Sequence, residues 1–187
     1  ICFLMTLFLA LNAFAGKYSE PSEKEISETL ETFKYKNSWI HPLIIHEFLP
    51  WMSDYSVPLI TGIDVAAATG TNRFFGKIIA KENLVSATDD KRNTTQYEWL
   101  GRLKNGMHAI VVSESGDGSM VAKTLAIFSL KKRPSTNETG KTYNRLELTI
   151  ERFVILGDRG VSTISLKENS ILVDVKCDKT CDSKNFT

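Results

Sequence analysis

The sequence has few of the residues on which metal sites and many catalytic sites depend. Its 187 residues include three cysteines and three histidines, and no group of them has the spacing of a zinc site. Neither sign of charge is in excess, because 23 lysines and arginines stand against 22 aspartates and glutamates. A net charge of +1 offers no general attraction to phosphate groups, so we expect no nucleic-acid partner. Hydrophobic residues, at 42%, are plentiful enough to bury a core, which excludes a wholly disordered chain.

Motifs of the common enzyme classes are absent as well. The chain has no G-x-S-x-G elbow, P-loop or G-x-G-x-x-G fingerprint, and His46-Glu47 does not continue into H-E-x-x-H. His41 and His46 are five residues apart, which points them in different directions on a helix or a strand. We therefore expect no catalytic residue, no metal and no cofactor, and the sequence favours a binding domain over an enzyme.

Residues 1–15 differ in character from the rest of the chain. They carry no charge, and their apolar run from Cys2 to Leu11 is shorter than the ~20 residues that span a bilayer. Ala13-Phe14-Ala15 has the small-x-small pattern that signal peptidase cleaves, and polar chain follows at once. We therefore expect a signal peptide over residues 1–15, a secreted or periplasmic location, and a mature chain that begins at Gly16 and has no membrane span.

The mature chain then keeps two cysteines, Cys177 and Cys181, in a C-terminal tail that we expect over residues 177–187. An oxidising compartment favours a disulfide between them if the three intervening residues turn tightly. Two free thiols are the alternative. A disulfide loop this short would contribute about 2 kcal/mol, which is enough to fix a tail but too little to hold a fold together.

The first segment of the mature chain, residues 16–36, is polar and predicts one short helix. Ser22 and Glu25 have the spacing of a capping box, in which each side chain accepts a hydrogen bond from the backbone of the other residue. Ile26, Leu30 and Phe33 then recur at helical spacing. This pattern predicts a helix over residues 23–35 with one narrow apolar stripe.

Strand patterns dominate residues 37–176, which we expect to form a single antiparallel β-rich domain. Asn105-Gly106 is typical of a hairpin turn in which both residues adopt positive φ. Residues 57–65 alternate as a strand does, although Asp64 could instead cap a short helix that ends at Gly70. No long helical pattern separates the strands, which excludes parallel βαβ units. The later strands are expected over residues 96–103, 107–114, 120–130, 142–156, 161–167 and 171–175.

The expected fold class is mainly β, or α+β at most: an antiparallel meander with a short N-terminal helix. A sheet of this length has two exposed edges, and closing as a barrel or a sandwich removes them. In the longest strand, strict alternation places Leu146, Leu148, Ile150 and Val154 on one face, which we expect to be buried. Glu147 falls on the other face and is expected to point into solvent.

Two short stretches combine residue types that suit the recognition of a ligand. Asn72 and Arg73 precede two phenylalanines, and Asp158 and Arg159 lie between the glycines of a predicted turn. Arginine offers a directed set of donors, and aromatic side chains offer contact area. The alternative is purely structural, with an arginine ion pair beside core phenylalanines in the first stretch and an ordinary turn in the second.

These features favour an exported, non-enzymatic β-domain that binds a small molecule or a protein partner. The alternative is a secreted hydrolase in which His108 works with a carboxylate, namely Asp54, Asp64 or Asp158. Such an enzyme must bring two titratable groups together in a cleft, whereas a binding domain needs only a concave, partly apolar surface. The contacts that His108 makes therefore separate the two hypotheses.

Overall fold

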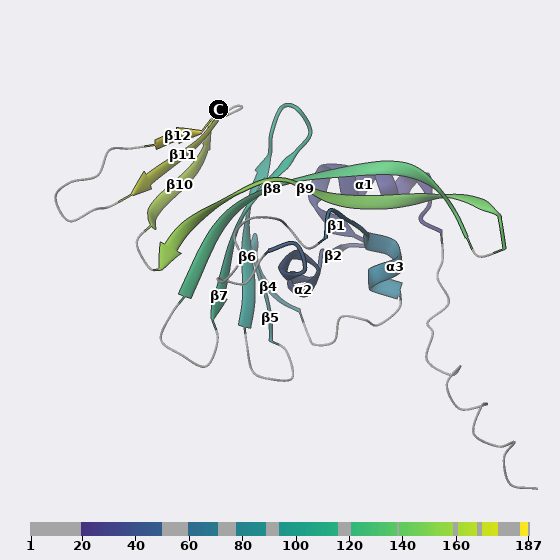
Figure 1. Ribbon diagram of the computed structural model, residues 1–187, viewed down its shortest axis with the longest axis horizontal. Coiled ribbons are helices and arrows are strands. Elements are labelled where there is room, and N and C mark those ends of the chain that lie inside the picture. The colour runs from purple at the N-terminus through teal and green to yellow at the C-terminus, as the bar shows by residue number, and fades with distance from the viewer. Residues whose placement is uncertain are drawn as a thin grey trace, which may run out of the picture.

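The computed structural model describes residues 20–49, 60–70, 78–88, 94–115, 121–137, 139–158, 161–167, 170–175 and 184–186. The predicted signal peptide lies outside these ranges. Within them, no helix is long and apolar enough to cross a membrane. The described chain consists of one large sheet, one small sheet, a two-stranded ribbon and short helices (Figure 1).

The large sheet has seven strands in the order β3-β9-β8-β7-β6-β5-β4, and every neighbouring pair is antiparallel. From β4 to β9 each strand pairs with the next in the chain, so the predicted antiparallel meander is confirmed. Closure as a barrel, one of the two alternatives, is not found, because β3 and β4 are the two edges and no ladder among the described residues joins them. The strands are β3 (Gly62–Asp64), β4 (Ile79–Lys81), β5 (Leu84–Thr88), β6 (Thr94–Arg102), β7 (His108–Ser115), β8 (Val121–Thr136) and β9 (Thr142–Asp158).

Other elements cover the two faces of this sheet unequally (Figure 1). The helices lie on one face with the ribbon of β1 and β2, and the small sheet β10-β11-β12 packs near one end of the opposite face. The predicted sandwich is therefore present only at that end of the large sheet. The small sheet has three short strands, which are too few to cover the face of a seven-stranded sheet. These elements are α1 (Glu23–Thr32), β1 (Lys34–Tyr35), β2 (Ser38–Trp39), α2 (Pro42–His46), α3 (Val65–Gly70), β10 (Val161–Lys167), β11 (Ser170–Val175) and β12 (Lys184–Phe186).

Local sequence signals explain where the helices begin and end. The capping box of α1 is confirmed, since Glu25 Oε2 accepts from Ser22 N at 2.7 Å and Ser22 Oγ accepts from Glu25 N at 3.3 Å. The helix ends at Thr32, before the expected residue 35, because Phe33 adopts a left-handed conformation with φ 58°. Asp64 ends β3 and also caps α3, whose first backbone N–H groups donate to its Oδ1 at 3.0 and 3.2 Å. The strand and the capped helix considered for this segment therefore occur in succession.

The β6–β7 connection is a hairpin, as Asn105-Gly106 predicts, but its turn is of a different type. Gly106 N donates to Leu103 O at 2.9 Å and Leu103 N donates to Met107 O at 2.8 Å, which closes a three-residue loop. Gly106 has φ 86°, the left-handed conformation that such a loop needs at its last position. Asn105 contributes through its side chain, because its Oδ1 accepts from Met107 N at 3.1 Å.

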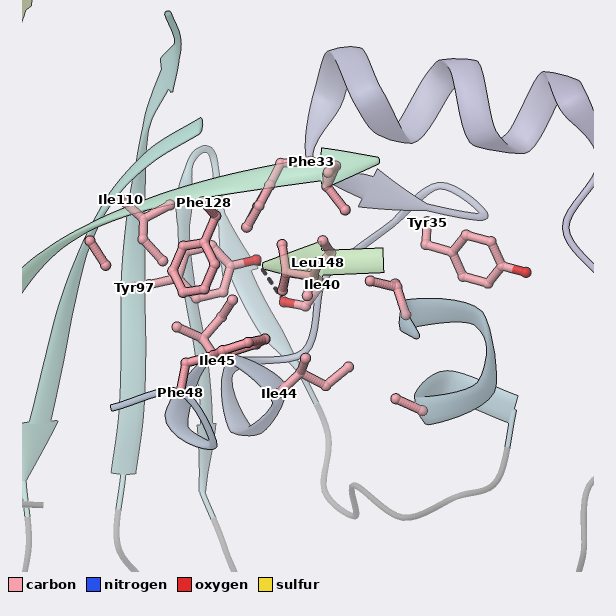
Figure 2. Close-up of a cluster of buried hydrophobic side chains, with 14 of the residues drawn as sticks. Phe33, Tyr35, Ile40, Ile44, Ile45, Phe48, Tyr97, Ile110, Phe128 and Leu148 are labelled. Atoms are coloured by element: carbon pink, nitrogen blue, oxygen red, sulfur yellow. Dashed lines mark hydrogen bonds between the residues drawn. The ribbon is translucent and has the colours of Figure 1, made fainter. Parts of the chain in front are cut away.

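A core of aromatic and aliphatic side chains fills the space between the large sheet and the helices (Figure 2). Phe128 on β8 meets Phe48 edge to face, with 5.2 Å between ring centroids, and lies 6.5 Å from the ring of Phe33. Tyr97 on β6 is fully buried, and its hydroxyl donates to Ile40 O at 2.7 Å (Figure 2). Burial raises the pKa of Tyr97 well above 10, so the hydroxyl stays protonated and its hydrogen bond is kept. The sheet and the N-terminal elements thus share one core.

The long strand β9 confirms the first half of the predicted alternation. Leu146 and Leu148 are fully buried in the helix-side core, as expected. The expectation for Glu147 is wrong, since its side chain is only 11% exposed. Arg133 Nε lies 2.9 Å from Glu147 Oε1, and Arg145 forms a second ion pair with the other oxygen. The carboxylate is buried because two arginines from neighbouring strands close over it.

Beyond these residues β9 reverses its faces at a β-bulge, which alternation alone does not predict. Two consecutive residues of β8 pair with Ile150 and Arg152, which leaves Glu151 as an extra residue. Val154 therefore lies on the opposite face of the sheet from Leu148. The expectation that these two side chains share one buried face is wrong, because the inserted residue shifts the alternation by one position.

Candidate ligand-binding site

A cavity of about 320 Å³ lies on the face of the large sheet that the helices do not cover. It is open on one side and is bordered by the β6–β7 hairpin, the middle of β8 and β9, and β11 of the small sheet. Its volume falls at the lower end of the range that is typical of small-molecule sites. Its apolar walls come from Leu103, Met107, Leu125, Ile127, Val154 and Ile171.

The β-bulge in β9 builds the polar rim of this cavity. Regular alternation would place Glu151 and Arg152 on opposite faces, but the extra residue brings both into the cavity lining. The sequence carries a trace of the bulge, since two consecutive charges interrupt an otherwise alternating strand. Sequence analysis missed both residues, because such a break does not reveal a cavity whose other walls come from distant segments.

The carboxylate of Glu151 is already engaged by β8. Ser129 Oγ donates to Glu151 Oε1 at 2.6 Å, and Lys131 Nζ donates to the same oxygen at 3.1 Å. The hydrogen bond from Ser129, followed by that from Lys131, lowers the pKa of Glu151 from its usual value of 4.5. Glu151 is therefore ionised at neutral pH, and the Lys131 ammonium balances its charge.

Arg152 and Asn105 differ from Glu151, because they keep donors for a ligand. Among the residues that the structure describes, Arg152 forms no hydrogen bond and no ion pair. Asn105 uses its Oδ1 to accept from Met107 N, which leaves its amide NH2 group as a donor. The rim thus offers one guanidinium and one amide to whatever occupies the cavity.

His108, the histidine of the hydrolase hypothesis, lies beside Phe33 in the helix-side core. Its Nε2 donates to Leu30 O at 3.1 Å and its Nδ1 accepts from Trp99 Nε1 at 3.3 Å, because a carbonyl only accepts and an indole only donates. Burial lowers the pKa of His108 to about 4, so the ring is neutral at neutral pH. Both ring nitrogens are engaged in holding α1 and β6 together, which leaves neither for a carboxylate or a substrate.

Three carboxylates are proposed as partners of His108. Asp64 makes other contacts, and the side chains of Asp54 and Asp158 lie outside the described part of the chain. Asp64 accepts the backbone N–H groups at the start of α3. Asp158 is the last residue of β9, opposite Ala122, and its side chain is outside the described part of the chain. Further predicted residues also lie outside it and stay predictions: Asp54, Asn72, Arg73, Arg159, Cys177 and Cys181.

A contact that sequence analysis missed joins α2 to the sheet. His46 Nδ1 at the end of α2 is in hydrogen-bond contact with Glu114 Oε1 near the end of β7. The two residues are far apart in sequence, so no local pattern could indicate the contact. Within the described ranges, no group of three or more histidines, cysteines or acidic residues gathers as a metal ion would require. The contact joins two elements of the fold, α2 and β7.

Comparison with protein-family models, with curated proteins and with solved structures finds no match to this chain. No residue of the cavity can therefore take a role from a related protein. The cavity itself combines apolar walls, one balanced carboxylate and two groups with donors.

Proposed function

We propose that this protein is a non-enzymatic binding domain, exported as its first residues predict, and that it holds a small apolar ligand in the cavity beside β9. The observation that supports this function is the cavity of about 320 Å³ with largely apolar walls. An apolar cavity that is open to a ligand and has a few polar groups at its rim is the usual form of a small-molecule site.

Catalysis has less support from the same geometry. The described lining of the cavity contains no histidine, cysteine, serine or lysine, so it lacks a thiol, hydroxyl or amine nucleophile and a histidine base. Its one carboxylate, Glu151, is held by Ser129 and Lys131. His108, the base of the hydrolase hypothesis, is buried on the other face of the sheet with both nitrogens engaged.

Titration with the neutral apolar dye N-phenyl-1-naphthylamine tests the binding function. The dye is expected to bind the full chain saturably, with a rise in fluorescence as it enters an apolar site. Val154→Phe places a ring in the cavity and is expected to weaken binding by about tenfold or more. Ile155→Phe is the matched control, because Ile155 is 44% exposed and the next residue of a strand points to the other face.

Two results would contradict the binding function. One is the absence of saturable binding to the wild-type chain. The other is equal binding by Val154→Phe and Ile155→Phe, with thermal unfolding confirming that both variants are folded. In that case the dye does not occupy this cavity.

A further inference from the structure

We propose that the ligand of the cavity is a small amphipathic carboxylate, with its apolar part against the walls and its carboxylate at Arg152. This inference rests on the proposed function, because it names the chemical class of ligand in the same cavity. It follows from the charge and the hydrogen-bonding groups of the rim.

The charges at the bulge leave one unbalanced cation. Glu151 and Arg152 are consecutive residues in the cavity lining, yet their surroundings differ. Lys131 lies 3.1 Å from Glu151 Oε1 and neutralises that carboxylate. Arg152 has no such partner among the described residues, so the cavity lining keeps one positive charge. Arg152 is exposed to solvent at the cavity, where an anionic ligand can form an ion pair with it and a neutral ligand cannot.

The hydrogen-bonding groups at the rim favour an acceptor. Arg152 carries only donors, in a planar fork that matches the two oxygens of a carboxylate. The Oδ1 atom of Asn105 is committed to Met107 N, so the free end of this amide also donates. Glu151 accepts from Ser129 and Lys131 through its Oε1 atom, and Lys131 balances its charge. An ammonium or alcohol head group would therefore find fewer partners than a carboxylate.

The walls determine the rest of the ligand. Leu125, Ile127 and Val154 lie on β8 and β9 next to the bulge, and Ile171 of β11 closes the cavity from the small sheet. Aliphatic walls suit an alkyl chain or another apolar body. One guanidinium and one amide match the single charge of a carboxylate, whereas a phosphate dianion would carry more charge than this rim balances.

Calorimetric titration of the full chain with decanoate and with decan-1-ol tests the inference, because the two probes share a chain and differ in charge. The wild-type chain is expected to bind decanoate about tenfold more tightly than the alcohol. Arg152→Gln is expected to remove this preference by weakening decanoate and leaving the alcohol unchanged. Lys81→Gln removes the same charge from the exposed edge strand β4 and is expected to keep the preference.

The outcomes separate this inference from the proposed function. Equal affinity of the wild-type chain for both probes, or an unchanged preference in Arg152→Gln, would overturn the inference alone. Binding of the neutral dye without any binding of decanoate would overturn it as well. If the wild-type chain binds neither the dye nor either probe, the proposed function fails and the inference fails with it.

Discussion

The two faces of the large sheet are built from the same strands but are packed differently. On the helix-covered face, side chains as large as Tyr97 and Phe128 are fully buried, and rings from the N-terminal elements fill the space between them. On the opposite face, a smaller buried cluster around Leu125 and Ile171 has a cavity of about 320 Å³ beside it. One face of the sheet therefore supplies most of the core, while the other is less completely filled and has a cavity.

Truncating a leucine on each face gives the largest expected effects. Leu148→Ala is expected to lower the free energy of unfolding by about 3–5 kcal/mol, because this fully buried side chain leaves a void in a rigid core. Leu125→Ala is expected to lower it by about 2–3 kcal/mol, because the cavity already removes part of the packing around Leu125. Urea unfolding measures both losses. A loss at Leu125 as large as that at Leu148 would show that the two faces are packed alike.

Acid is expected to weaken the helix-covered face through His108. Burial lowers the pKa of His108 from 6.5 to about 4, and unfolding restores the ordinary pKa. Between these values the unfolded chain binds a proton that the native protein does not, so the free energy of unfolding falls as the pH falls. Above about pH 6.5 the shifted pKa of His108 takes nothing from the free energy of unfolding. By about pH 4 this free energy has fallen by about 3 kcal/mol because of His108.

The control for this pH dependence is His108→Gln. Glutamine can still donate to Leu30 O and accept from Trp99 Nε1, but it does not titrate. The difference between wild type and variant in urea midpoints, measured from about pH 7 to about pH 4, isolates the contribution of His108. Parallel curves for the two proteins would mean that His108 takes up its proton equally well in the folded state.

Adding one methylene group to each face gives the smallest effects and the sharpest test of the cavity. Val112 is fully buried in the helix-side core, so Val112→Ile is expected to cost about 1–3 kcal/mol through overpacking. Val154 is half-buried and lines the cavity, so Val154→Ile is expected to be neutral or to stabilise the fold by up to about 0.8 kcal/mol. Thermal unfolding compares the two variants. A larger loss at Val154 would show that the cavity cannot accept even one added carbon.

Sequence patterns were sufficient for the features that depend on residues a few positions apart. The capping box of Ser22 and Glu25, the hairpin at Asn105-Gly106 and the burial of Leu148 are of this kind. The faces of β9 beyond Glu151 were not predictable in the same way. A bulge is defined by the pairing partner, so alternation within one strand does not locate the residue at which the faces exchange.

The candidate site was harder to predict than the fold, because its parts are distant in sequence. The walls and rim come from the β6–β7 hairpin, β8, β9 and β11, and no local motif joins them. A mixture of residue types within a short stretch is visible in the sequence, as at Asn72, Arg73, Asp158 and Arg159, whereas a cavity assembled from single residues of several strands is not. The role of His108 was similarly hidden, since its partners Leu30 and Trp99 come from other elements.

The large sheet is open, and its two edges differ in how much backbone they leave without a partner strand. The backbone N–H and C=O groups on the outer side of an edge strand have no partner strand. A long, flat edge can therefore pair with a strand of another chain. Here the edges β3 and β4 are three residues each, and Lys81 places a charge at the end of β4. The edge formed by β4 is therefore a poor template for a further strand. The other edge is longer, because β3 pairs only with Glu147–Thr149 of the 17-residue β9, and among the described residues no other strand pairs with the rest of that side of β9.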